Sequence, residues 1–175
     1  MRLRCLILLI PVVTSIGCHR HHHFADEAHS LTPERKAAVE DSVRQFVSNV
    51  AHDVTQDGPL AWRKHFSDSP AFFMAVNGTL AFPNGHAAAQ AIPEIARQYK
   101  HIELRWGDDL RVDALTENLC VVAASYTEVI ELQPGVGGMQ GTQRGYFTGL
   151  AEKRNGQWQF RNAHWSAAVP PSKAT

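Results

Sequence analysis

The residues best suited to chemistry stand at the end of the chain. Residues 157–168 alternate in the pattern of a β-strand, with one face made of Trp158, Phe160, Asn162, His164 and Ser166. A face that begins with aromatic side chains and ends with polar ones is typical of a sheet that leaves a dry core and enters a pocket. An imidazole there could be a general base or proton shuttle, or a structural histidine that hydrogen bonds to a neighbour. His164 is therefore the first candidate catalytic residue.

Glu128 and Tyr126 are the predicted partners of His164. Both fall on one face of a strand in which Cys120 and Val122 share the same parity. A buried carboxylate would raise the histidine pKa and desolvation would lower it, so the sequence leaves the charge of His164 open. Glu128 is the second candidate catalytic residue.

The remaining pocket residues depend on the loop at Asn155-Gly156, a strong hairpin signal. A two-residue loop would turn Phe147, Gly149 and Ala151 toward the Trp158 face. We predict a three-residue loop, because it turns Tyr146 and Thr148 toward that face beside His164. The predicted ligand pocket then consists of Trp62, Phe66, Tyr126, Tyr146, Thr148 and His164.

The elements that must position these residues follow from local patterns. Thr32-Pro33 and a stripe of valines predict a helix that ends at Asp57-Gly58-Pro59, and a short helix should run from Pro59 to about Phe66. Residues 71–82 form a hairpin around Asn77-Gly78, and 85–99 a helix after the cap Asn84. Four long strands are predicted at 101–116, with a bend at Gly107-Asp108, and at 118–133, 138–154 and 157–168. This order indicates an α+β domain with one curved antiparallel sheet.

The element order and the segments GYFTGL, NGQWQF and HWS resemble the nuclear-transport-factor-2-like superfamily, in particular its SnoaL-like and ketosteroid-isomerase-like branches. The resemblance covers residues 31–168. It implies a cone-shaped sheet packed on three N-terminal helices, with a cavity that in this superfamily serves isomerases, cyclases, dehydratases and noncatalytic modules. Ketosteroid-isomerase-like sites use an early acidic base and a tyrosine on the first helix. Neither is present here, which argues against steroid-type isomerisation.

The N-terminus predicts export. Residues 1–17 combine basic residues, a short apolar run and a small-residue end, as in a signal peptide, and Cys18 follows as in the lipobox of bacterial lipoproteins. We expect a lipid on Cys18 to anchor the protein in the cell envelope, facing the periplasm or exterior. Cleavage after Gly17 without lipidation is the alternative. Residues 18–30 then form a His-rich tether, 31–168 the folded domain and 169–175 a tail.

The composition argues against nucleic-acid binding and gives little support for a metal or cofactor. Lysine plus arginine equals aspartate plus glutamate at 17 each, which gives no net field for nucleic acid. No cofactor is predicted, and a metal is a minor alternative confined to the tether histidines His19, His21, His22 and His23. Cys120 is expected to be a small buried hydrophobe.

Three functions remain open. The first is an exported domain that binds a small apolar ligand in its cone. The second is an acid–base enzyme of cyclase, dehydratase or isomerase type that uses His164. The third is an assembly module, in which the outer sheet face with Trp165 forms a homodimer.

Overall fold

The structure, a computed structural model, describes residues 31–168. Its longest helix, α1 (Pro33–Asp57), begins where Thr32 accepts a hydrogen bond from the Arg35 amide, and Pro33 occupies the first turn. Gly58 ends it with a φ of 73°. One face is buried and consists of Val43, Phe46, Val47, Val50 and Val54. The predicted helix is confirmed. Within residues 31–168, no helix has the length and apolar character needed to cross a membrane.

Two shorter helices follow. The predicted helix at 59–66 is a 3-10 turn, η1 (Gly58–Ala61), continued by the single turn α2 (Trp62–His65). Asn84 caps α3 (Gly85–Ala96) by accepting a hydrogen bond from the Ala87 amide, and Pro93 lies inside that helix. Helix α3 ends before the predicted residue 99, because the chain enters the sheet at Tyr99.

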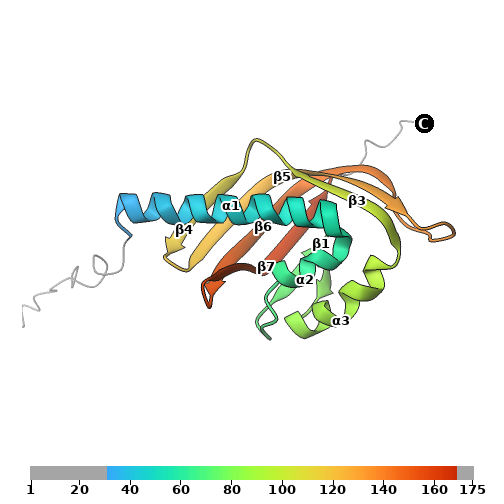
Figure 1. Ribbon diagram of the computed structural model, residues 1–175, viewed down its shortest axis with the longest axis horizontal. Coiled ribbons are helices and arrows are strands. Elements are labelled where there is room, and N and C mark those ends of the chain that lie inside the picture. Colours follow the sequence, from blue (N-terminus) through green and yellow to red (C-terminus); the bar gives the residue numbers. More distant parts are fainter. Residues whose placement is uncertain (1–30, 169–175) are drawn as a thin grey trace, which may run out of the picture. The chain divides into compact units, whose positions relative to one another are not determined.

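A seven-stranded sheet wraps around α1, with α2 and α3 gathered at one end (Figure 1). Its strands are β1 (Phe73–Val76), β2 (Thr79–Phe82), β3 (Tyr99–Trp106), β4 (Arg111–Thr116), β5 (Leu119–Leu132), β6 (Gly141–Arg154) and β7 (Gln157–Ala167). The order is β2-β1-β7-β6-β5-β3, and β4 also pairs with β5. The predicted α+β cone is confirmed, but the sheet is mixed because β1 runs parallel to β7.

The predicted strand 101–116 is two strands. β3 and β4 both pair with β5 and are separated by residues 107–110. The strands separate at Gly107, where a larger residue would have to displace the Ser125 hydroxyl, since a Cβ would overlap with its oxygen. Asp109 fixes the break, since its carboxylate accepts hydrogen bonds from the amide and hydroxyl of Ser125.

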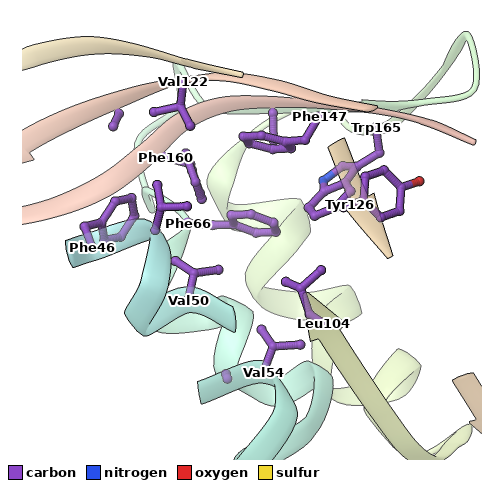
Figure 2. Packing of buried hydrophobic residues seen from close by; sticks show 14 of the residues in the cluster. Phe46, Val50, Val54, Phe66, Leu104, Val122, Tyr126, Phe147, Phe160 and Trp165 are labelled. Atoms are coloured by element: carbon purple, nitrogen blue, oxygen red, sulfur yellow. The ribbon is translucent and has the colours of Figure 1, made fainter. Parts of the chain in front are cut away.

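The core lies between α1 and the concave face of the sheet (Figure 2). Phe160 of β7 is fully buried, with its ring centroid 5.0 Å from those of Phe46 and Phe147. At one end of this core, Trp165 packs against Tyr126 at 4.7 Å. The aromatic core therefore continues from α1 toward the end of the cone where α2 and α3 lie.

The β6–β7 hairpin corrects the predicted register. Arg154 pairs with Gln157, so the loop has only the two residues Asn155 and Gly156, with φ angles of 51° and 81°. These left-handed angles suit a tight two-residue turn, and the predicted three-residue loop is wrong.

A β-bulge then reverses the alternation of β7. Ala151 pairs with Phe160 but Leu150 pairs with Asn162, which leaves Arg161 as the extra residue. The Asn162 side chain accepts a hydrogen bond from the Leu150 amide. Beyond the bulge, Ala163 and Trp165 point inward.

Candidate functional site

A cavity of about 520 Å³ occupies the end of the cone. Residues from α2, α3 and the strands β1, β2, β3, β5, β6 and β7 line it, together with the loop between β5 and β6. Its walls are mainly aromatic and aliphatic and include Trp62, Phe66, Met74, Phe82, Ile92, Ile95, Ile102, Ile130 and Trp165. Volume and lining are those of a small-molecule pocket.

Glu128 brings a carboxyl group into this apolar cavity. On β5 it lies between Leu104 of β3 and Gln143 of β6. Within residues 31–168 its side chain forms no hydrogen bond or ion pair, whereas Asp53, Asp109, Asp113 and Glu131 each have a side-chain partner. Burial raises the pKa of Glu128 from 4.5 to about 7. At neutral pH this group is therefore divided between its acid and carboxylate forms.

Tyr99 and Tyr126 line the same cavity. Burial, and secondarily the charge of Glu128, raise the pKa of both phenols, that of Tyr126 to about 12. Both hydroxyls therefore stay protonated at neutral pH and can donate hydrogen bonds. Gly145 makes room for Tyr126, because a Cβ there would lie 2.6 Å from the Tyr126 hydroxyl.

The structure divides the predicted pocket residues into two groups. Trp62, Phe66, Tyr126 and Glu128 lie around the cavity. Tyr146, Thr148 and His164 are exposed and do not line it. Tyr146 and Thr148 turn outward because of the two-residue loop, and His164 turns outward because of the bulge at Arg161. The predicted inward placement of these three side chains is wrong.

The predicted position of Trp165 is also wrong, but this side chain lies inside the cone instead of outside. It was expected on the outer face, as part of a dimer surface, but it is 7% exposed and lines the cavity. The outer face still carries Tyr146 and Val121, each 38% exposed. A homodimer through this face stays a prediction. Sedimentation at a protein concentration on the order of tens of micromolar would test it, because a monomer at that concentration would argue against the dimer.

Sequence reasoning missed several cavity residues, including Tyr99, Gln143 and Trp165. If β7 is assumed to alternate without interruption, Trp165 falls on the outer face of the sheet. No residue type near Arg161 indicates the bulge that turns Trp165 inward. Tyr99 was placed at the end of a helix. The parity of β5 offered the best signal, since it put Tyr126 and Glu128 on one face.

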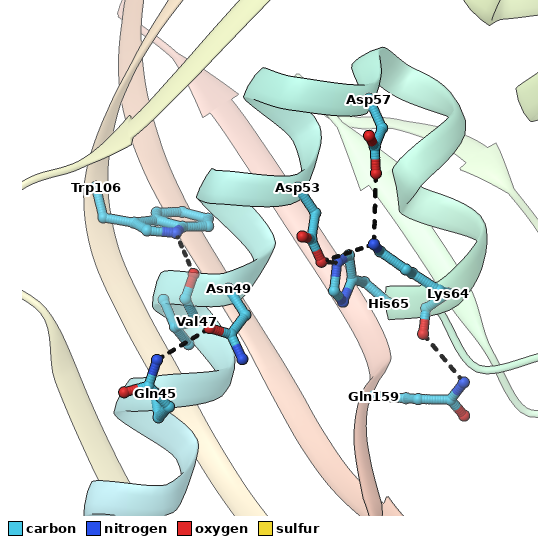
Figure 3. A network of polar contacts seen from close by, with 9 residues as sticks. All are labelled: Gln45, Val47, Asn49, Asp53, Asp57, Lys64, His65, Trp106 and Gln159. Carbon is cyan, nitrogen blue, oxygen red and sulfur yellow. Dashed lines mark hydrogen bonds and ion pairs between the residues drawn. The ribbon is translucent and has the colours of Figure 1, made fainter.

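A second polar cluster lies on α1 and α2 (Figure 3). His65 Nε2 and Lys64 Nζ each lie 2.9 Å from a carboxylate oxygen of Asp53. Lys64 is the main cause that lowers the pKa of Asp53, whereas burial lowers the pKa of His65 against the opposing effect of Asp53. Neither His65 nor Asp53 lines the cavity. The cluster ties α2 to α1 and so holds Trp62 and Phe66 in the cavity wall.

The other predicted chemical groups do not add to the site. Cys120 is fully buried, and burial raises the pKa of its thiol to about 11, so it is a poor nucleophile. Cys18, His19, His21, His22 and His23 lie outside the described residues. Among residues 31–168, no group of three or more His, Cys, Asp or Glu side chains is arranged to hold a metal ion.

Comparison with known proteins gives matches in structure only. No protein-family model matches the chain, and no curated protein matches its sequence. A protein from Novosphingobium aromaticivorans, provisionally assigned as a scytalone dehydratase, superposes with a TM-score of 0.66 at 11% identity over 82% of this chain and 100% of its own. A nuclear transport factor 2-like protein from Salmonella enterica gives 0.63 at 11% identity over 78% and 96%.

A hexachlorocyclohexane dehydrochlorinase, LinA-type3 from Novosphingobium barchaimii, superposes with a TM-score of 0.60 at 12% identity, over 82% of this chain and 97% of its own. These likenesses agree on one architecture. The chain has the nuclear-transport-factor-2-like fold, with a curved sheet packed against the N-terminal helix. At such low sequence identity, the structural similarity supports a shared fold but not a shared activity.

Proposed function

We propose that this protein binds a small, largely apolar molecule in the cavity of its cone domain, and that a lipid on Cys18 anchors it to the bacterial cell envelope. The observation that carries the first part is the cavity of about 520 Å³, which has aromatic walls and the carboxyl of Glu128, for which residues 31–168 provide no partner. A few polar groups on an apolar wall are the usual means of orienting a small ligand.

The ligand body is expected to fill the apolar part of the cavity. Trp62 stacks on Phe66 at a centroid distance of 5.0 Å and meets Trp165 edge-on at 5.5 Å. Together these rings give the cavity a rigid aromatic wall at low entropic cost. Glu128, Tyr99 and Tyr126 supply the polar contacts. A compact ring system with one polar group matches this arrangement.

Filling the cavity is expected to abolish ligand binding. Ile95→Trp places a larger ring in the space, so compact apolar alcohols, phenols and amines that raise the melting temperature of the wild type by a few degrees should have no effect on the variant. Leu115→Trp is the matched control, because Leu115 is exposed on β4 away from the cavity. If no compound shifts the wild type, or if Ile95→Trp responds like the wild type, the binding proposal fails.

Acid–base catalysis is the second candidate, and the pKa of Glu128 near 7 favours it. A carboxylate with this pKa can accept a proton from a substrate at neutral pH, while the tyrosine hydroxyls can donate hydrogen bonds to a leaving group. Two of the structural neighbours are named for eliminations, a dehydratase and a dehydrochlorinase. Here Glu128 replaces His164 as the candidate base. Mass spectrometry of compounds recovered after incubation separates the two functions, because a binding protein returns them unchanged.

The lipid anchor has its own test. Cys18 follows the apolar segment and Thr14-Ser15-Ile16-Gly17, so it should become the acylated first residue of the mature protein. Cys18→Ala should block processing or move the protein from the membrane fraction to the soluble fraction. Intact-mass measurement should show the acyl mass on the wild type alone. An unmodified wild-type N-terminus would contradict the anchor.

A further inference from the structure

The charge inside the cavity narrows the ligand class. Among the lining residues that belong to the described range 31–168, Glu128 carries the only carboxyl, and no lysine, arginine or histidine is present. Tyr99 and Tyr126 are the other titratable lining groups, and both stay neutral near pH 7 because their pKa values are raised. The cavity therefore offers either no net charge or one negative charge. A ligand carboxylate or phosphate would find no cation to pair with and would face Glu128.

We propose that the cavity selects a hydrophobic organic cation, an amine with a compact apolar body, whose ammonium group pairs with Glu128. This proposal rests on the proposed binding function and specifies its ligand. An ammonium group would give Glu128 the charge-assisted partner that no side chain of residues 31–168 provides. A neutral alcohol could form only an ordinary hydrogen bond there.

The cavity walls also suit a cation. Tyr99, Tyr126, Trp62 and Trp165 all line the space that Glu128 enters. Trp165 meets Tyr126 edge-on at 4.7 Å and Trp62 at 5.5 Å, so differently oriented rings border the same volume. Aromatic faces attract ammonium ions, and more strongly where water is excluded. The apolar body of the amine would then pack on Met74, Ile92 and Ile95.

The groups that face Glu128 imply a simple pH dependence. β3 contributes Leu104 and Tyr99, β6 contributes Gln143, and β5 contributes Tyr126. The charged pair Lys100–Glu131 is exposed and does not line the cavity. Between pH 6 and pH 8, Glu128 is thus the cavity group that changes its charge. If the amine binds the carboxylate form, its affinity should increase about tenfold over this interval, because the competent fraction increases by that factor.

Three compounds with one rigid body test the proposal. Adamantylamine, adamantanol and adamantane carboxylate are titrated into the full chain by calorimetry, with tryptophan fluorescence as a second readout. At pH 8 the amine should bind at least tenfold more tightly than the alcohol, and the carboxylate should bind most weakly. Only the amine should bind about tenfold more weakly at pH 6.

Two isosteric variants complete the test. Glu128→Gln should reduce the affinity for adamantylamine at least tenfold and abolish its pH dependence. It should change the affinity for adamantanol far less, because the glutamine side chain can still form a hydrogen bond with a hydroxyl. Glu131→Gln makes the same chemical change outside the cavity and should behave like the wild type. Equal binding of amine and alcohol, or an unchanged Glu128→Gln, would overturn the amine proposal while leaving apolar ligand binding intact. Failure of all three compounds to bind would overturn both.

Discussion

Replacing Glu128 with glutamine is expected to stabilise the ligand-free protein at pH 8 by about 2 to 3 kcal/mol. Burial raises the pKa of Glu128 from 4.5 in the unfolded chain to about 7 in the folded one. Such a difference corresponds to roughly 3 kcal/mol, which we reduce because the side chain is partly exposed. Glutamine keeps the shape of the side chain and removes the charge that the cavity must desolvate.

The pH dependence of this stabilisation follows from the binding of a proton to Glu128. Because the folded state holds the proton of Glu128 more tightly than the unfolded state, the contribution of Glu128 to stability is most favourable below pH 4.5. The contribution of Glu128 to stability then falls as the pH rises through 7 and is constant at higher pH. Glu128→Gln should therefore differ little from the wild type near pH 4.5 and exceed it increasingly up to pH 8.

Urea unfolding at several pH values between 4.5 and 8 measures this difference. Glu131→Gln is the matched control: Lys100 lowers the pKa of the exposed Glu131, so the loss of this charge should change stability only slightly and in the destabilising direction. A Glu128→Gln variant that is no more stable than the wild type at pH 8 would show that Glu128 has a compensating partner in the folded state.

A residue that lowers stability and has no internal partner is the kind expected at a functional site. Two other partly buried or surface carboxylates within residues 31–168 have close cationic partners: Asp53 pairs with Lys64 and His65, and Asp113 pairs with Lys36. Glu128 instead faces Tyr126 and the apolar wall. Proteins keep such unfavourable groups where binding or catalysis needs them. This contrast supports Glu128 as the centre of the site.

Local patterns predicted most of the fold. The cap at Thr32, the valine stripe of α1 and the turns at Asn77-Gly78 and Asn155-Gly156 depend on neighbours in sequence, and the structure has each of them. The parity of β5 also correctly grouped Tyr126 with Glu128. These features are readable because one or a few adjacent residues determine them.

Features set by tertiary contacts could not be predicted. The bulge at Arg161 depends on how β7 meets β6. The bend at Gly107-Asp108 was readable from the sequence, but the hydrogen bonds between Asp109 and Ser125 that fix it join two different strands. The parallel pairing of β1 with β7 joins segments about 90 residues apart. Because alternation has a period of two, the single bulge was enough to exchange the faces of His164 and Trp165.

That exchange leads to the largest expected destabilisation, from Trp165→Ala. The Trp165 ring lies within 4.7 to 5.6 Å of four aromatic rings, those of Trp62, Trp106, Tyr126 and Phe147. Removing a buried ring at the centre of such a cluster leaves a void that its neighbours fill only in part. We expect a loss of about 3 to 5 kcal/mol, together with loss of ligand binding, because one wall of the cavity disappears.

The adjacent residue supplies the control. His164→Ala removes an exposed side chain from the outer face of the same strand, so it should change the free energy of unfolding by less than about 0.5 kcal/mol and leave binding unchanged. Uninterrupted alternation of β7 would give the opposite ranking, with His164 inside and Trp165 outside. Urea unfolding of the two variants thus tests the bulge, and with it the composition of the cavity wall around Glu128.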